Sequence, residues 1–253
     1  MSQTARHYHE KTLQMLSPRP VYSLTNAAIL EERKRICRVG FPEALRQWYS
    51  LENATALLRQ HSNDDHPVPL QELGEPVVDW YGVKHRDFLS NSLLWIMGEN
   101  QGVCNWAVDL NGSDDPPVLV EVDSAPKDNW VLHAGTFSEF IYCRVWDSPL
   151  WGFSCSPQEP VLREYDLKLL RSRFLAEPTT YGWPGDAQVR FTAPQGRILL
   201  WITQSCGVDW KVSARTADQL ESLVQAVWDI GTLASTLYGP GAPGESVLSK
   251  LRR

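Results

Sequence analysis

The chain has 253 residues, of which 43% are hydrophobic and 21% are charged, and its net charge is −6. This composition is typical of a globular protein and excludes a disordered or fibrous chain. The longest apolar runs, such as residues 198–202, are much shorter than the roughly 18 residues of a membrane-spanning helix. The N-terminal residues lack the apolar stretch of a signal peptide, and five cysteines without paired spacing indicate reduced thiols. We therefore expect a soluble cytoplasmic protein with no membrane partner.

The first 60 residues predict an N-terminal extension followed by three helices. Residues 1–25 are assigned to the extension, most of which we expect to be poorly ordered. Asn26 is a typical N-cap for a first helix, which Gly40 would end. Pro42 is well placed at the first position of a second helix, and a third, shorter helix buries Leu58.

The middle of the chain predicts a sheet. Residues 93–97 are apolar throughout, as in a buried strand, whereas residues 104–110 and 118–123 alternate between apolar and polar side chains. Short loops between these strands favour an antiparallel meander. The Thr-Phe-Ser-Glu sequence at residues 136–139 is a capping box that opens another helix. The expected fold class is therefore α+β, with an antiparallel sheet meander flanked by helices.

Residues 148–240 predict an additional C-terminal α+β subdomain. It begins with a helix near residues 166–174 and ends with a helix that the capping box at residues 216–219 opens. Its strands are expected at residues 189–192, 198–202 and 210–214. Glycine and proline dominate the sequence that follows, so residues 241–253 are expected to be a flexible tail.

Motifs for catalysis and metal binding are incomplete. The Gly-Phe-Ser-Cys-Ser sequence at residues 152–156 lacks the final glycine of a nucleophile elbow, and no histidine follows residue 133. Cys104 lies in an alternating strand and is interpreted as a buried structural cysteine. Two histidines and two aspartates within residues 61–66 have the chemistry of metal ligands, but an irregular loop offers no fixed geometry. The sequence therefore assigns no catalytic residue, metal site or cofactor.

The order of several features resembles the SUKH superfamily. These features are Gly40-Phe41-Pro42 at the second helix, the strand 104–110 after Gly102, the Pro-Pro-Val sequence at residues 116–118, and the capping box at 136–139. The resemblance covers about residues 26–147, and it implies a non-enzymatic SUKH-like α+β binding domain. Bacterial members of this family act as immunity proteins that neutralise polymorphic toxins, and fungal members act as signalling scaffolds. The resemblance carries over no catalytic residues.

The charge is concentrated in the middle of the chain. Residues 61–150 carry a net charge of −11, whereas the segments on either side are slightly positive. Such a field repels nucleic acid and attracts basic protein surfaces, although acidic loops also serve simply to keep a protein in solution. We expect Asp64, Asp65, Asp114 and Asp115, in two loops, to contribute to the binding of a toxin domain with a basic face. The alternatives are a regulatory scaffold in signalling or envelope synthesis, and an enzyme that uses convergent carboxylates.

Overall fold

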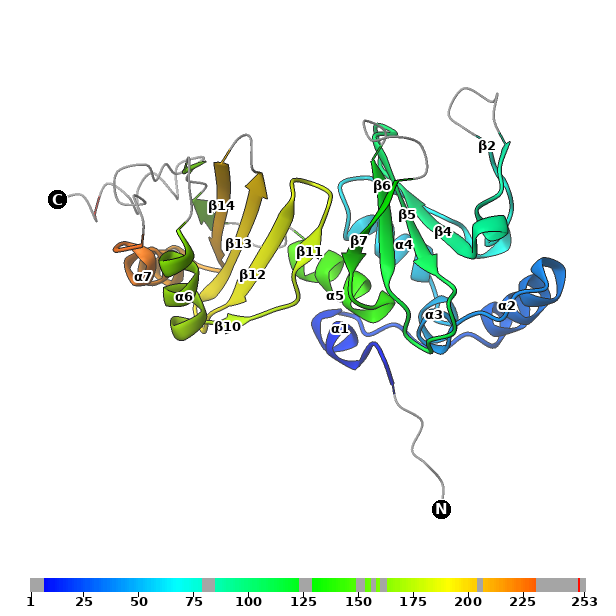
Figure 1. The fold of residues 1–253 in the computed structure, drawn as a ribbon. Helices are drawn as coiled ribbons and strands as arrows, with labels where there is room; N and C mark the ends of the chain where they lie inside the picture. The colour runs from blue at the N-terminus through cyan, green and yellow to red at the C-terminus, as the bar shows by residue number, and fades with distance from the viewer. Residues whose placement is uncertain are drawn as a thin grey trace, which may run out of the picture. The chain divides into compact units, whose positions relative to one another are not determined.

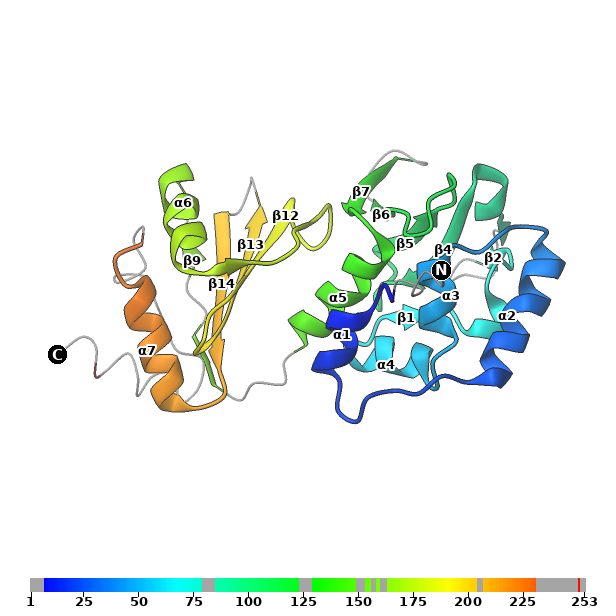
Figure 2. The same cartoon turned by 90° about the horizontal axis from the view of Figure 1, so that it is seen from below.

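The computed structural model of the protein divides into two compact units, Met1–Ser148 and Pro149–Arg253 (Figures 1 and 2). Each unit combines helices with an antiparallel sheet, which confirms the predicted α+β class. The boundary between the units lies after residue 148, whereas the sequence analysis expected it after residue 147. The expected flexible tail, apart from Lys250, lies outside the described residues. The structure describes residues 7–78, 85–122, 129–148, 153–155, 158–159, 163–203, 207–230 and 250.

Four helices open the first unit: α1 (Glu10–Met15), α2 (Leu24–Cys37), α3 (Glu43–Tyr49) and α4 (Ala54–Gln60). Ser23 starts α2, because its hydroxyl accepts a hydrogen bond from the Asn26 backbone N–H. The helix ends before Gly40, since Arg38 adopts a left-handed conformation with φ 56°. The expectation of a poorly ordered extension is wrong for residues 10–15, which form α1 and bury Leu13.

A five-stranded sheet, ordered β1-β4-β5-β6-β7, forms the centre of the first unit. Its strands are β1 (His66–Pro67), β4 (Leu93–Gly98), β5 (Cys104–Asp109), β6 (Val118–Val122) and β7 (Trp130–Ala134). The three predicted strands match β4, β5 and β6, which pair antiparallel. The two edge strands, β1 and β7, have no clear signal in the sequence pattern. Between β1 and β4 lie η1 (Leu70–Glu72), β2 (Val77–Val78), β3 (His85–Arg86) and η2 (Phe88–Asn91).

The helix α5 (Phe137–Asp147) packs on one face of this sheet. Thr136 starts it as predicted, with its hydroxyl accepting a hydrogen bond from the Glu139 N–H at 3.1 Å. Phe140 of α5 lies 6.4 Å from the ring of Trp106 on β5 and 5.7 Å from that of His133 on β7, measured between ring centroids. Because all three side chains are buried, this face of the sheet forms the main core of the unit.

His9 anchors the N-terminal segment to this core. Its side chain is 1% exposed, and its Nε2 atom lies 2.7 Å from the carbonyl oxygen of Ala44. Its ring contacts Trp48 of α3 at 5.4 Å and Phe137 of α5 at 5.8 Å between centroids. Burial lowers the pKa of His9 to about 4, so the imidazole is neutral in the folded chain near pH 7.

The described part of the second unit contains a seven-stranded antiparallel sheet and the helices α6 and α7. Its elements are β8 (Phe153–Cys155), β9 (Gln158–Glu159), α6 (Glu164–Arg173), β10 (Leu175–Ala176), β11 (Thr180–Tyr181), β12 (Ala187–Thr192), β13 (Gly196–Thr203), β14 (Gly207–Ala214) and α7 (Ala217–Val227). The main path is β10-β12-β13-β14-β8, with β11 paired to β12 and β9 paired to β14. The predicted three strands and final helix match β12, β13, β14 and α7.

This unit has a hydrophobic core of its own. The apolar face of α7, including Leu220 and Leu223, packs with Trp210 and the inner side chains of the sheet. Arg190 is also fully buried, and it donates hydrogen bonds to the Gln188 Oε1 atom at 2.7 Å and to the Thr180 hydroxyl at 3.1 Å.

Within the described ranges of the chain, no helix is both long and apolar enough to span a membrane.

The burial of His9 predicts a loss of stability in acid. Between about pH 6.5 and pH 4, the unfolded chain binds a proton at His9 and the folded chain does not. The free energy of unfolding should therefore fall by about 3 kcal/mol across this range, because each pKa unit is worth about 1.4 kcal/mol. Urea unfolding of the native chain and of His9→Leu at several pH values measures this contribution.

The Leu13→Ala variant is the matched control, since it weakens the packing of the same segment without removing the imidazole. It should be less stable at every pH, but its free energy of unfolding should depend on pH as steeply as that of the native chain. An equally steep pH dependence in the native chain and His9→Leu would contradict the assignment of this dependence to His9.

Candidate functional site

The four aspartates expected to bind a partner lie at two opposite ends of the first sheet. Asp65 accepts a hydrogen bond from the backbone N–H of Asn100, in the turn between β4 and β5. Asp114 and Asp115 lie in the connection between β5 and β6, beyond the other end of β5. Six residues of β5 separate the two places, which corresponds to roughly 17–20 Å. The structure therefore brings together two pairs of aspartates and not one group of four.

Asp65 is a buried structural residue. Its side chain is 3% exposed, and its Oδ2 atom lies 2.9 Å from a guanidinium nitrogen of Arg144 on α5. The same guanidinium lies 4.2 Å above the ring of Trp106 and 5.2 Å from the ring centroid of Phe140. Burial raises the pKa of Asp65, and the positive charge of Arg144 opposes this rise. Asp65 thus joins its loop to α5, and it does not belong to an exposed acidic turn.

The other three aspartates differ in exposure. Asp115 accepts hydrogen bonds from the backbone N–H of Ser138 at 2.9 Å and from its hydroxyl at 2.6 Å, so it stabilises the start of α5. Asp114 is exposed, although its backbone oxygen accepts a hydrogen bond from Ala44 N–H. Asp64 is also exposed and lies 3.6 Å from Arg59. Asp64 and Asp114 are therefore the two carboxylates of this set that a partner could reach.

The described residues that were considered for catalysis or metal binding do not form a common cluster. His61 is buried, and burial lowers its pKa. Cys104 is buried on β5, as the alternating pattern predicted. Ser154 lies on β8, where side chains are outside the described part of the structure. In the part of the chain that the structure describes, no group of three or more His, Cys, Asp or Glu side chains could hold a metal ion.

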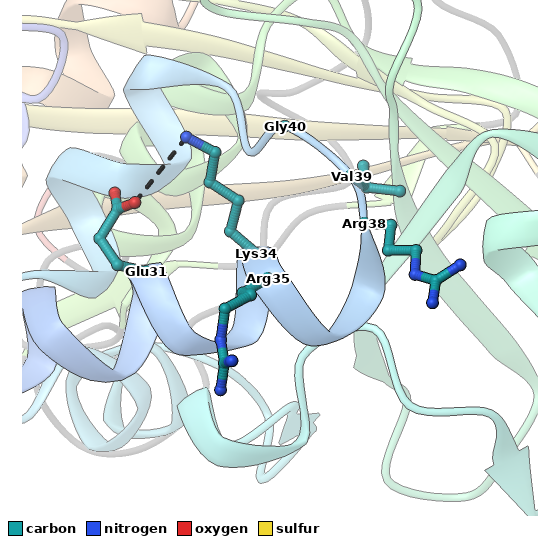
Figure 3. A pocket seen from close by; sticks show the side chains of 6 residues that line it. All are labelled: Glu31, Lys34, Arg35, Arg38, Val39 and Gly40. Carbon is teal, nitrogen blue, oxygen red and sulfur yellow. Dashed lines mark ion pairs between the residues drawn. The ribbon is translucent and has the colours of Figure 1, made fainter.

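A surface depression of about 420 Å³ at the C-terminal end of α2 is basic (Figure 3). Its cations are Lys34, Arg35 and Arg38, and the figure shows their charged groups pointing in different directions. Lys34 lies 3.8 Å from Glu31, and Arg35 lies 2.7 Å from Glu32. Cations near a helix C-terminus also offset the negative end of the helix dipole. We therefore interpret this cluster as helix stabilisation and not as an anion site.

The face of the first sheet opposite α5 presents a different surface. Trp106 points toward α5, so its neighbours Asn105 and Ala107 project to the opposite face. Residues paired across antiparallel strands share a face, and two cross-strand rows follow from the register. The rows are Trp95-Ala107-Leu119-Leu132 and Gly98-Asn105-Glu121-Trp130.

Aromatic rings gather on this face. Phe88 of η2 lies between the two tryptophans, 6.3 Å from Trp95 in a stacked arrangement and 5.7 Å from Trp130 in a T-shaped one. Leu119 packs against the same cluster and, like both tryptophans, stays partly exposed. Leu132, at the end of its row, is 48% exposed. We call these five side chains the aromatic face, and we take it as the candidate functional site.

The charged residues of the four strands β4, β5, β6 and β7 are all acidic. These strands contain Asp109 and Glu121, and none of their residues is Lys or Arg. Asp109 pairs with Leu93 and Glu121 pairs with Trp130, so both carboxylates belong to rows on the aromatic face, where Asp109 is partly exposed and Glu121 is buried. An apolar centre with acidic neighbours suits a basic protein surface better than a nucleic acid.

The sequence contained one signal for the aromatic face. Residues 93–97 are apolar at every position, which predicted a strand covered on both faces. The structure shows that α5 lies on one side of the sheet and η2 supplies Phe88 on the other. The contribution of Trp130 to this face could not be predicted from the sequence, because β7 has no alternating pattern and its pairing partner is set by the tertiary fold.

Comparisons with protein families, curated proteins and solved structures found no match to this chain.

The ion pair between Asp65 and Arg144 predicts a strongly non-additive effect on stability. Arg144→Met leaves the buried carboxylate without its counter-charge and should lower the free energy of unfolding by about 3–5 kcal/mol. Asp65→Asn in the same background should restore part of this loss, because it removes the uncompensated charge. Urea unfolding of the two single variants and the double variant gives the coupling energy. Strictly additive losses would contradict the structural role of the pair.

Proposed function

We propose that this protein is a non-catalytic binding protein of the immunity type, which neutralises a toxin domain by covering it. The observation that carries the proposal is the aromatic face, where Trp95, Trp130 and Leu132 are accessible on an acidic sheet. The resemblance of residues 26–147 to SUKH proteins supports the same role. No catalytic residue or cofactor is part of the proposal.

The physical argument concerns affinity. Tryptophans that are partly exposed on a rigid sheet supply large contact areas with little loss of side-chain freedom, and they are frequent among the residues that dominate binding energy. Toxins that cleave nucleic acid present basic clefts to phosphate, so an acidic surface is complementary to them and accelerates association. The net charge of −11 in residues 61–150 supplies this field.

The partner can be tested directly. A tagged native chain should retain one dominant, stoichiometric protein from the lysate of its source cells at low salt, and titration should give a nanomolar dissociation constant. Trp130→Ala should weaken this affinity by about tenfold or more. Trp201→Ala, a tryptophan that is 40% exposed in the second unit, is the matched control and should bind like the native chain.

Circular dichroism and thermal unfolding of each variant separate lost binding from lost folding. Several weakly bound partners would instead favour the regulatory scaffold. Equal affinities for the native chain and a folded Trp130→Ala variant would remove the aromatic face from the proposal.

The exposed aspartates should act on the rate of association and not on folding. Reversal of charge at Asp64 and Asp114 changes two exposed side chains at opposite ends of the sheet. We expect the association rate constant to fall by several-fold at low salt and to approach the native value at high salt, because ions screen long-range steering. Stopped-flow binding to the captured partner measures this effect. An unchanged rate at low salt would show that these two residues do not contribute.

A further inference from the structure

Among the described strands, β7 ends the first sheet and pairs only with β6. In the strand order β1-β4-β5-β6-β7 its partner is β6, and no further described strand follows it. Two of its side chains, Val131 and Leu132, are 39% and 48% exposed. They project to opposite faces of the sheet, because successive residues of a strand alternate. The open edge is thus apolar on both faces.

This edge carries none of the usual side-chain protection against a further strand, although its register with β6 shifts between Val118 and Leu119. Natural edge strands are commonly blocked by lysine, by proline or by charged side chains that point inward. The residues of β7, Trp-Val-Leu-His-Ala, include no proline and no Lys, Arg, Asp or Glu. An unprotected edge of this kind is a template for main-chain pairing with an extended segment.

The edge is continuous with the aromatic face. Leu132 pairs with Leu119 of β6, and that row continues to Trp95 of β4. Trp130 projects to the same face two residues earlier, with its ring partly exposed. An added strand would therefore place one side chain beside Leu132 and another beside the ring of Trp130.

Charge decides between a second copy of this chain and a basic partner. Two copies paired through β7 would bring together two segments of net charge −11, and like charges at close range oppose association. A partner segment with lysine or arginine meets an attractive field and can also place its cation over the ring of Trp130. The acidic sheet thus favours a basic, extended occupant.

We propose that β7 binds an extended segment of the partner as a sixth strand. The segment carries apolar side chains beside Val131 and Leu132 and a lysine or arginine beside Trp130. This inference rests on the proposed protein-binding function and adds the mode of docking to it.

A short peptide tests the inference without the natural partner. The fluorescein-labelled peptide Thr-Arg-Val-Val-Val-Arg-Thr presents an arginine and two valines to β7 in either strand direction. Its fluorescence anisotropy should rise on titration with the native chain at low salt, and the same peptide with proline at its centre should not bind. Amide hydrogen exchange of residues 130–134 in the native chain should slow when the peptide is present.

Two variants locate the binding. Leu132→Lys adds a charge to the edge and should weaken peptide affinity by about tenfold or more. Ile36→Lys, at a residue of α2 that is 53% exposed, is the matched control and should bind like the native chain. Equal binding by the native chain and Leu132→Lys, equal binding of the proline peptide, or no binding at about 1 mM would overturn the inference.

Three further outcomes separate this inference from the proposed function. A tight natural partner whose affinity falls in Trp130→Ala but is unchanged by Val131→Lys, at the edge but outside the aromatic face, would leave the proposed function standing and overturn the edge-strand mode. The native chain could instead sediment as a dimer that Leu132→Lys dissociates. This result would show that β7 pairs with a second copy of the chain, and it would also overturn the proposed binding of a partner strand. Peptide binding at β7 without a single tight natural partner would support the mode and contradict the immunity role.

Discussion

The arrangement of the first unit depends on how α5 is held against its sheet. One guanidinium, that of Arg144, lies 4.2 Å above the ring of Trp106 and 2.9 Å from the carboxylate of Asp65. This single group joins α5, β5 and the loop before β1. At the other end of the helix, Asp115 accepts two hydrogen bonds from Ser138. Both ends of α5 are therefore held by aspartates, and a buried ion pair of this kind fixes geometry more than it adds stability. The consequence is a sheet with one face largely covered by α5 and the core.

The opposite face follows from this constraint. With α5 on one side, the side chains that alternate with Trp106 must project to the other, where η2 supplies Phe88 and leaves Trp95 and Trp130 partly exposed. Large apolar side chains that stay accessible on a rigid surface are typical of protein-binding sites. The second unit has a separate core and buries its own arginine, Arg190, in hydrogen bonds to neutral acceptors. The proposed binding function is therefore assigned to residues of the first unit alone.

Local signals explain which parts of the fold could be predicted. Thr136 and Thr216 start α5 and α7 as their capping boxes indicated, because each hydroxyl accepts a hydrogen bond from a backbone N–H three residues later. The short helix α1 could not be predicted, since its stability comes from tertiary contacts such as those of His9 and not from its own six residues. The candidate site was harder still. Asp64 and Asp65 are adjacent in the sequence, yet one is exposed and the other buried, because Asp65 meets Arg144 of α5 and the backbone N–H of Asn100, both distant in the sequence. The same limit applies to Trp130, whose role depends on its neighbours across the sheet.

The most direct measurement of the central claim is amide hydrogen exchange of the native chain with and without its captured partner. If the aromatic face is the binding surface, protection on binding should concentrate in residues 88–98, 105–109, 118–122 and 130–134 of the first unit. The helices α2 and α4 and the whole second unit should exchange as in the free chain. Protection confined to those helices or to residues 163–230, with β4, β5, β6 and β7 unchanged, would contradict the account.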